Sequence, residues 1–322
     1  MRKRALLLLV VGVVGLLFAQ TATSATRVFR LAEVHPDGYP TTEGDKYFAK
    51  LVNERSGGRL KIEVYFGGTL GPEKDTMEMT KMGAIDAVRT SCSPLVEMYA
   101  PIGVFSMPYL FRDEAHMWKV LNGEVGQHFL KAVESAGFVG LTYYDSGARH
   151  FYTKKLVKSP ADLRGMKIRV QQSSVMLDLV NSMGASAVPM AFNEVYSALQ
   201  TGVIDGAENN SPSYLTTSHY EVAKFYALDG HTRIPEVILF SKRIWDTLPP
   251  ADQALIRQAA LDSTAFQREA WKKFEDEALA KVKASGCTIT EVNISEFQKA
   301  VESMYAKYPQ YSEWVEKIRA VK

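Results

Sequence analysis

The sequence is poor in the residues on which metal and redox sites are usually built. Only two cysteines, Cys92 and Cys287, and six histidines occur among 322 residues. No Cys-x-x-Cys or His-Glu-x-x-His spacing is present, so the sequence predicts no metal site. The two cysteines could close one large loop in an oxidising compartment. Because Cys92 lies among apolar residues, we interpret it instead as a buried free thiol.

The signatures of common catalytic mechanisms are missing as well. The chain has no Gly-x-Ser-x-Gly nucleophile elbow and no glycine-rich phosphate-binding loop. The sequence therefore predicts a protein that is not an enzyme and holds no cofactor. The alternative that the residues leave open is a hydrolase in which Glu73 and His35 serve as acid and base.

Apolar residues form a long uninterrupted run only at the N-terminus. Arg2, Lys3 and Arg4 precede the apolar residues 5–19, and small residues follow at 23–25. This order is typical of a secretory signal peptide, which we predict over residues 1–25, with cleavage after Ala25 or, as the second choice, Ala22. The run is shorter than the ~20 residues of a membrane span. A retained N-terminal anchor helix is the alternative.

A strong excess of one charge is also lacking. Removal of residues 1–25 takes away three of the 38 basic residues and leaves 35 against 36 acidic ones, a formal net charge of −1. No basic run interleaved with aromatic residues occurs. These two observations argue against nucleic acid as a partner.

The pattern that is present is the alternation of strands and helices typical of an α/β protein with a mostly parallel sheet. Nearly 300 mature residues usually divide into two domains. We expect strands at 29–32, 60–65, 84–88 and 138–144, with helices at 42–56, 73–82 and within 115–137.

The alternation restarts after Gly147. We expect strands at 151–152, 166–170 and 203–205, a helix start at 159–162, and helices at 175–183 and 193–201, the last with Asn193 as N-cap. Residues 250–285 read as one helix, which could span ~50 Å at 1.5 Å per residue. A helix of that length predicts a brace between two domains.

Arg169 is the most informative single residue. It lies between β-branched residues on the short buried strand predicted over 167–170. A guanidinium does not lose its proton, and its planar fork matches a carboxylate in a bidentate geometry. A buried strand rarely carries such a charge without a partner. Either an internal Asp or Glu neutralises Arg169, or an anion from solution does.

Several segments, taken together and in order, resemble the substrate-binding subunit of a tripartite ATP-independent periplasmic (TRAP) transporter. The matching segments are 52–60, 71–73, 146–149, 165–171, 189–200 and 202–210. The resemblance implies a periplasmic protein with two α/β lobes and a ligand cleft between them. It places residues 26–146 and about 235–274 in the first lobe. Residues 147–234 and about 275–322 form the second.

The resemblance also implies the residues of the site. Arg169 corresponds to the arginine that pairs with the ligand carboxylate, and Arg149 to a second arginine. Asn209 corresponds to an amide near that carboxylate, and Phe192 to a wall of the pocket. The combination favours anion binding over an internal salt bridge for Arg169.

The first-lobe segments resemble those of members that bind hexuronates, chiefly residues 33–41, 71–75 and 144–149. His35 and Glu73 would then hydrogen-bond sugar hydroxyls; the alternatives are a loop histidine and a helix-start acid in solvent. Ser91 is a departure, because uronate-binding relatives tend to have Asn and sialate-binding ones Glu at this position. We predict D-glucuronate or D-galacturonate as ligand.

Two residues of the segment that returns to the first lobe complete the predicted site. His231 would support the arginines, and Glu236 would meet a hydroxyl at the hinge; a purely structural role is the alternative for both. The implied partners are the small and large integral membrane subunits of a TRAP transporter, and we expect a monomer. A binding protein for a C4-dicarboxylate or other organic acid, or a subunit that presents its ligand to a sensor, are the other readings.

Overall fold

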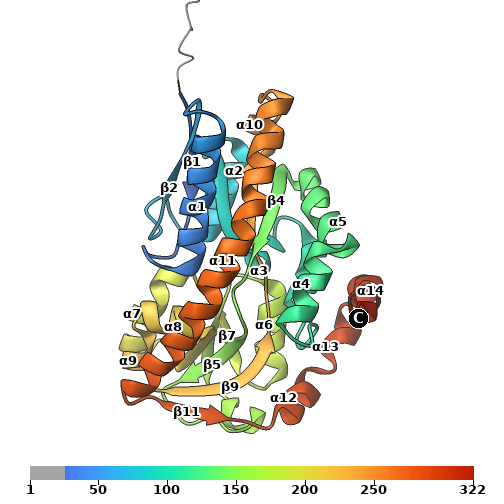
Figure 1. The fold of residues 1–322 in the computed structure, drawn as a ribbon. Helices are drawn as coiled ribbons and strands as arrows, with labels where there is room; N and C mark the ends of the chain where they lie inside the picture. The colour runs from blue at the N-terminus through green and yellow to red at the C-terminus, as the bar shows by residue number, and fades with distance from the viewer. Residues whose placement is uncertain (1–25) are drawn as a thin grey trace, which may run out of the picture.

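The computed structural model describes residues 26–322, which form two lobes around two separate β-sheets (Figure 1). The signal peptide predicted over 1–25 lies outside the described residues. No helix within 26–322 is both long and apolar enough to cross a membrane. The predicted α/β architecture with two lobes is confirmed by the two sheets and their flanking helices.

The first lobe is built on a five-stranded sheet in the order β2-β1-β3-β10-β4. β1 pairs in parallel with β2 and β3, whereas β10 pairs antiparallel with β3 and β4. The strands are β1 Arg27–Ala32, β2 Leu60–Tyr65, β3 Ala87–Ser91, β4 Phe138–Tyr144 and β10 Glu236–Ser241. Because β10 comes from a distant part of the chain, the first lobe is assembled from two stretches of sequence.

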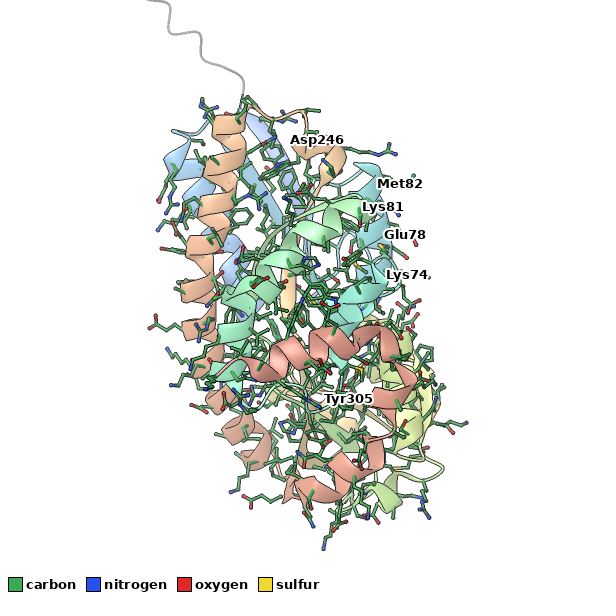
Figure 2. All side chains as sticks on the ribbon, turned by 90° about the vertical axis from the view of Figure 1, so that its right-hand side faces the viewer. Lys74, Glu78, Lys81, Met82, Asp246 and Tyr305 are labelled. Atoms are coloured by element: carbon green, nitrogen blue, oxygen red, sulfur yellow. The ribbon has the colours of Figure 1, made fainter. Side chains whose placement is uncertain are left out.

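Helix α2 of the first lobe is amphipathic. On α2, Lys74, Glu78 and Lys81 lie outward at helical spacing, whereas Met77 is buried (Figure 2). The helices of this lobe are α1 Pro40–Arg55, α2 Glu73–Met82, α3 Cys92–Leu95, η1 Ala100–Ser106, α4 Glu114–Asn122, α5 Glu124–Ala132, η2 Val133–Ala136 and α10 Lys242–Trp245.

The second lobe has a six-stranded sheet in the order β11-β9-β5-β8-β6-β7. Its strands are β5 Arg149–Thr153, β6 Lys167–Val170, β7 Ser186–Pro189, β8 Gly206–Asn209, β9 Phe225–Thr232 and β11 Thr288–Glu291. Its helices are η3 Pro160–Leu163, α6 Ser174–Ser182, η4 Phe192–Glu194, α7 Val195–Thr201, α8 Ser211–Thr216 and α9 His219–Val222. β6 lies between β7 and β8 and is parallel to both, so Arg169 is on a central strand.

The long helix α11, Pro250–Ala284, packs against α1 and β4 of the first lobe and against α8 of the second (Figure 1). The predicted bracing helix is therefore confirmed. It is followed by α12 Ile294–Val301, α13 Met304–Lys307, η5 Pro309–Tyr311 and α14 Ser312–Ala320.

The last helices return toward the first lobe. α12 contacts β9 and α6, whereas α14 packs against α5, and His116 Nε2 lies 3.0 Å from the carbonyl oxygen of Ile318. The sequence predicts that residues from about 275 to 322 belong to the second lobe; within this stretch α12 contacts the second lobe and α14 the first. We keep the two interlobe boundaries as a prediction, with the C-terminal segment touching both lobes.

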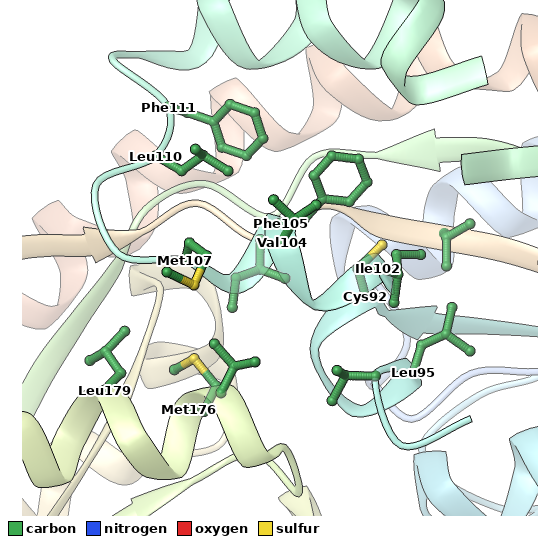
Figure 3. Close-up of a cluster of buried hydrophobic side chains, with 14 of the residues drawn as sticks. Cys92, Leu95, Ile102, Val104, Phe105, Met107, Leu110, Phe111, Met176 and Leu179 are labelled. Atoms are coloured by element: carbon green, nitrogen blue, oxygen red, sulfur yellow. The ribbon is translucent and has the colours of Figure 1, made fainter. Parts of the chain in front are cut away.

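The largest buried apolar cluster also includes residues of both lobes. Cys92, Leu95 and Val104 of the first lobe share it with Met176 and Leu179 of α6 (Figure 3). Cys92 and Cys287 are both buried and free. A continuous apolar contact therefore supports the two lobes beside the polar cleft.

Two predicted strands were wrong by a few residues, for one physical reason. Gly83 and Gly202 both adopt left-handed backbone conformations and end α2 and α7. The apolar residues after each glycine then donate a hydrogen bond back into the helix, as Ile204 N does to Ala198 O at 3.3 Å. These residues read as the strands 84–88 and 203–205, but β3 and β8 begin three residues later.

The predicted N-cap at Asn193 was also wrong. The short helix η4 occupies 192–194, and α7 starts after Glu194 with no side-chain capping bond.

The contact between α1 and α11 predicts a measurable effect at Gly44. A methyl group there would lie 2.8 Å from Gln267 Cγ and 2.9 Å from Tyr144 Cε2. Gly44→Ala gains ~1 kcal/mol of helix propensity but forces overpacking that typically costs ~1–3 kcal/mol. We expect a net loss of up to about 2 kcal/mol in the free energy of unfolding, measured by urea denaturation. Lys50→Ala, on the exposed face of the same helix, should change it by less than ~0.5 kcal/mol; a stabilised Gly44→Ala would contradict the packing argument.

Candidate functional site

A small cavity lies between the lobes. Seven of the nine predicted site residues line it, and Ser91 and His231 do not. The lining residues are Val34, His35, Glu73, Arg149, Arg169, Gln171, Phe192, Asn209, Asn210 and Glu236. A larger and more open hollow around Tyr109 and Glu275 contains none of the predicted residues. We place the site in the smaller cavity because the charged side chains converge there.

Arg169 lies in the cavity without a carboxylate partner. Its Nε and Nη2 atoms donate to the carbonyl oxygen of Met190 at 3.0 and 2.7 Å, and no carboxylate within residues 26–322 lies within 4.0 Å. Burial and the neighbouring Arg149 lower the pKa of Arg169, but a guanidinium remains charged at any physiological pH. The described residues offer no internal salt bridge, so an anion is needed to neutralise this group.

Arg149, in contrast, is held by Glu208. Its Nε atom donates to Glu208 Oε2 at 2.5 Å and its Nη2 atom to Oε1 at 2.9 Å. Burial opposes the charge of Glu208, but Arg149 and His231 outweigh it and lower the pKa of Glu208 to about 2. Arg149 therefore reaches the cavity as an oriented, partly neutralised cation.

His231 stands behind this pair. Its Nε2 atom lies 3.3 Å from Glu208 Oε2 and its Nδ1 atom 2.8 Å from Asp229 Oδ2. Burial lowers the pKa of His231, but Asp229 and Glu208 raise it more, to about 9. The charged imidazole can support Arg149 through Glu208, without contact to a ligand.

On the first-lobe side, the cluster is centred on Arg89, which sequence reasoning missed. This fully buried guanidinium donates to Glu33 Oε2 at 2.6 Å and lies near Glu236 Oε2 at 2.5 Å and Glu73 Oε1 at 3.4 Å. The available signal was an arginine next to apolar strand residues, as at Arg169. The strand predicted to end at residue 88 extends to Ser91 in the structure, so it includes Arg89.

His35 is anchored to this cluster. Its Nδ1 atom lies 2.9 Å from Glu33 Oε1 and 2.7 Å from Arg89 Nη2, and Tyr39 stacks on its ring at 3.9 Å. Burial and Arg89 lower the pKa of His35, so the ring is neutral at physiological pH. Phe192 of the second lobe packs edge-on against His35, with ring centroids 5.1 Å apart, and forms an apolar wall.

Glu73 and Glu236 each keep one carboxylate oxygen free of hydrogen bonds to the rest of 26–322. Glu73 Oε1 accepts from the backbone N–H of Ser91 at 3.0 Å, whereas Oε2 has no such partner. Burial raises the pKa of Glu236 to about 7, against the opposing effect of Arg89. The Ser91 hydroxyl accepts from the backbone N–H of Ser93 at the start of α3 and so faces away from the cavity lining.

The two adjacent asparagines have different roles. Asn209 Oδ1 accepts from the backbone N–H of Asn210, which leaves the Asn209 NH₂ group as a donor. The Asn210 amide is already satisfied by Ser146, Ser213 and Tyr39. Of this pair, Asn209 is the residue suited to a ligand.

The cavity is therefore chemically divided. The second-lobe side presents the hydrogen-bond donors of Arg169, Arg149 and the Asn209 amide, with the side chain of Gln171 beside them. The first-lobe side presents free oxygens of Glu73 and Glu236 beside neutral His35. Such a site suits a molecule with a carboxylate at one end and hydroxyl groups at the other.

Two lobes with a polar cavity between them are the arrangement expected of a solute-binding protein. The sequence profile of the family described as bacterial extracellular solute-binding protein, family 7, matches residues 31–311, and the chain belongs to this family. It is a substrate-binding component of a TRAP transport system and not an enzyme, as the sequence predicted.

Solved structures of TRAP periplasmic solute-binding proteins are closely similar. The Bradyrhizobium sp. BTAi1 protein, in complex with α/β-D-galacturonate, is 46% identical with a TM-score of 0.89, covering 91% of this chain and 99% of that chain. The Citrobacter koseri protein, with bound D-glucuronate, is 40% identical with a TM-score of 0.90, covering 92% and 100%.

A more distant relative has another named ligand. The C4-dicarboxylate-binding periplasmic protein of Rhodobacter capsulatus is 31% identical, covering 96% of this chain and 95% of its own.

The raised pKa of His231 predicts a pH-dependent stability. With a folded-state pKa of about 9 against an ordinary 6.5, the folded protein holds this proton more tightly. The resulting stabilisation is complete below pH 6.5 and disappears as the pH rises through 9, a change of about 3 kcal/mol. We expect the ligand-free unfolding free energy to fall by this order between pH 6.5 and 9.5.

The matched variants are His231→Gln and, on the surface of α5, His128→Gln. His231→Gln should flatten the dependence, whereas His128→Gln should follow the unchanged protein. Parallel curves for all three proteins would contradict the charged imidazole. Glu236, with a pKa of about 7, changes the unfolding free energy mainly below pH 6.5.

Proposed function

We propose that this protein captures a D-hexuronate, D-glucuronate or D-galacturonate, between its two lobes. The observation that carries the proposal is the buried, unpaired guanidinium of Arg169 facing free carboxylate oxygens of Glu73 and Glu236 across one cavity. A uronate carboxylate would neutralise Arg169, and its hydroxyls would donate to the opposite wall. The uronates bound by the similar structures support this choice of ligand.

The C4-dicarboxylates are the competing ligand class. A second carboxylate would have to lie beside Glu73 and Glu236, where like charges in a closed cavity repel strongly. Sialate is bulkier, and Ser91 provides no acid like the Glu of sialate-binding relatives. A sugar acid avoids both difficulties.

We further propose the following roles for the site residues. Arg169, Arg149 and Asn209 bind the carboxylate. His35, Glu73 and Glu236 bind hydroxyl groups. Phe192 forms the apolar wall. His231 supports Arg149 from behind. Ser91 acts through its backbone N–H, which orients Glu73.

Residues 1–25 would direct the chain to the periplasm as a cleavable signal peptide. There, a monomer would deliver its ligand to the small and large integral membrane subunits of a TRAP transporter. The alternative is that the protein presents its ligand to a sensor. Measuring uptake of labelled uronate by cells that lack this protein distinguishes the two: uptake is lost if the protein serves a transporter and unchanged if it serves a sensor.

The proposed ligand class predicts the outcome of a direct comparison. The mature protein is titrated by calorimetry with glucuronate, galacturonate, succinate and sialate. At least one uronate should bind more tightly than succinate by roughly a hundredfold. The reason is that the second carboxylate of succinate would lie unpaired beside Glu73, at a cost of ~3 kcal/mol. Tight binding of succinate with no response to either uronate would overturn the proposal.

The role of Arg169 predicts the effect of its removal. Arg169→Ala should weaken uronate binding by ~3 kcal/mol or more, beyond a hundredfold. Arg169→Lys should not restore affinity, because an ammonium cannot reproduce the bidentate fork. Arg55→Ala, which removes a surface arginine paired with Asp262, is the matched control and should bind normally. Near-normal affinity in folded Arg169→Ala would refute the assignment.

A further inference from the structure

Gln171 is a buried polar residue of the cavity to which none of the roles above applies. It follows β6, two positions after Arg169, and both side chains line the cavity. Only 7% of Gln171 is exposed, and its Oε1 atom is buried without a hydrogen-bond partner within residues 26–322. An unpaired buried carbonyl oxygen is costly, so such groups normally have a donor nearby.

The nature of the missing donor limits the ligand group that Gln171 can contact. Asn210, also in the lining, is satisfied by protein groups and offers no comparable vacancy. A ligand carboxylate has no proton to donate at neutral pH, and neither has the ring oxygen of a pyranose. Within a bound hexuronate, the group that can donate to Oε1 is therefore a hydroxyl group.

The position of Gln171 next to Arg169 identifies which hydroxyl this is. In a hexuronate the carboxylate carbon is attached to C5, whose ring neighbours are the ring oxygen and C4. The hydroxyl nearest to a carboxylate bound at Arg169 is therefore the one on C4. D-Glucuronate and D-galacturonate differ only at this carbon, where the hydroxyl is equatorial or axial.

We propose that Gln171 is a specificity-determining residue that accepts a hydrogen bond from the C4 hydroxyl of the uronate; this inference rests on the proposed function. One epimer places this hydroxyl within reach of Oε1, and the other leaves the buried oxygen unpaired. A site built to bind a hydroxyl by hydrogen bonding discriminates more strongly than an apolar pocket. The protein thus distinguishes the two uronates at one atom.

The test compares Gln171→Met with the unchanged protein. Methionine keeps the length of the side chain and removes the amide, and Gln127→Met on the exposed face of α5 is the matched control. Calorimetry with both uronates and with succinate gives the affinities, and thermal unfolding of each ligand-free variant checks the fold.

We expect the unchanged protein and Gln127→Met to prefer one epimer by roughly tenfold or more. Gln171→Met should lose affinity for that epimer, reduce the ratio to within about threefold, and unfold at an equal or higher temperature. An equal loss for all ligands would mean that Gln171 only shapes the cavity, and equal binding of both epimers by the unchanged protein would also overturn the assignment. Failure of the unchanged protein to bind any uronate would instead overturn the proposed function on which the assignment rests.

Discussion

The structure depends on how it neutralises buried positive charge. Within residues 26–322, three arginines are almost fully buried: Arg89, Arg149 and Arg169. Glu33 and Glu236 hold the first, Glu208 holds the second, and the third contacts only a backbone carbonyl. A buried charge without a counter-ion is destabilising, and the proposed counter-ion of Arg169 is the carboxylate of the ligand. Neutralisation of Arg169 therefore contributes both to ligand binding and to the stability of the fold.

The same arrangement explains why the two sides of the cavity differ. Arg89 draws three carboxylates together, and each of the two that reach the cavity contacts it through one oxygen. The remaining oxygens form an acceptor surface that attracts hydroxyl groups and repels a second anion. In the proposed roles, recognition of the carboxylate belongs to the second lobe, and recognition of hydroxyls belongs mainly to the first, with one further hydroxyl contact at Gln171 of the second lobe. A ligand that satisfies both must hold the lobes together.

Much of the local structure could be predicted because its causes are local. The bounds of 60–65, 73–82 and 138–144 were predicted correctly, since the apolar pattern lies within each segment and, for 73–82, Gly83 follows directly as an end signal. The errors at β3 and β8 arose because apolar residues after a left-handed glycine look like the start of a strand. Seven predicted site residues line the cavity. Gln171 was not predicted, although it ends the family-like segment 165–171, because the sequence does not show whether an uncharged amide has an internal partner. Arg89 was not predicted because its strand was expected to end at residue 88.

By itself the sequence determined the class of protein: two α/β units, a long bracing helix, and ordered motifs specific to one family of binding proteins. It could not decide which strand arginine has an internal partner. Arg89 and Arg169 both lie on short buried strands, but the carboxylates that hold Arg89 come from 56 residues before it and 147 residues after it in the chain. Pairing over such distances is fixed only when both sheets have formed and the lobes have come together. That tertiary arrangement, and no local pattern, leaves Arg169 free for a ligand.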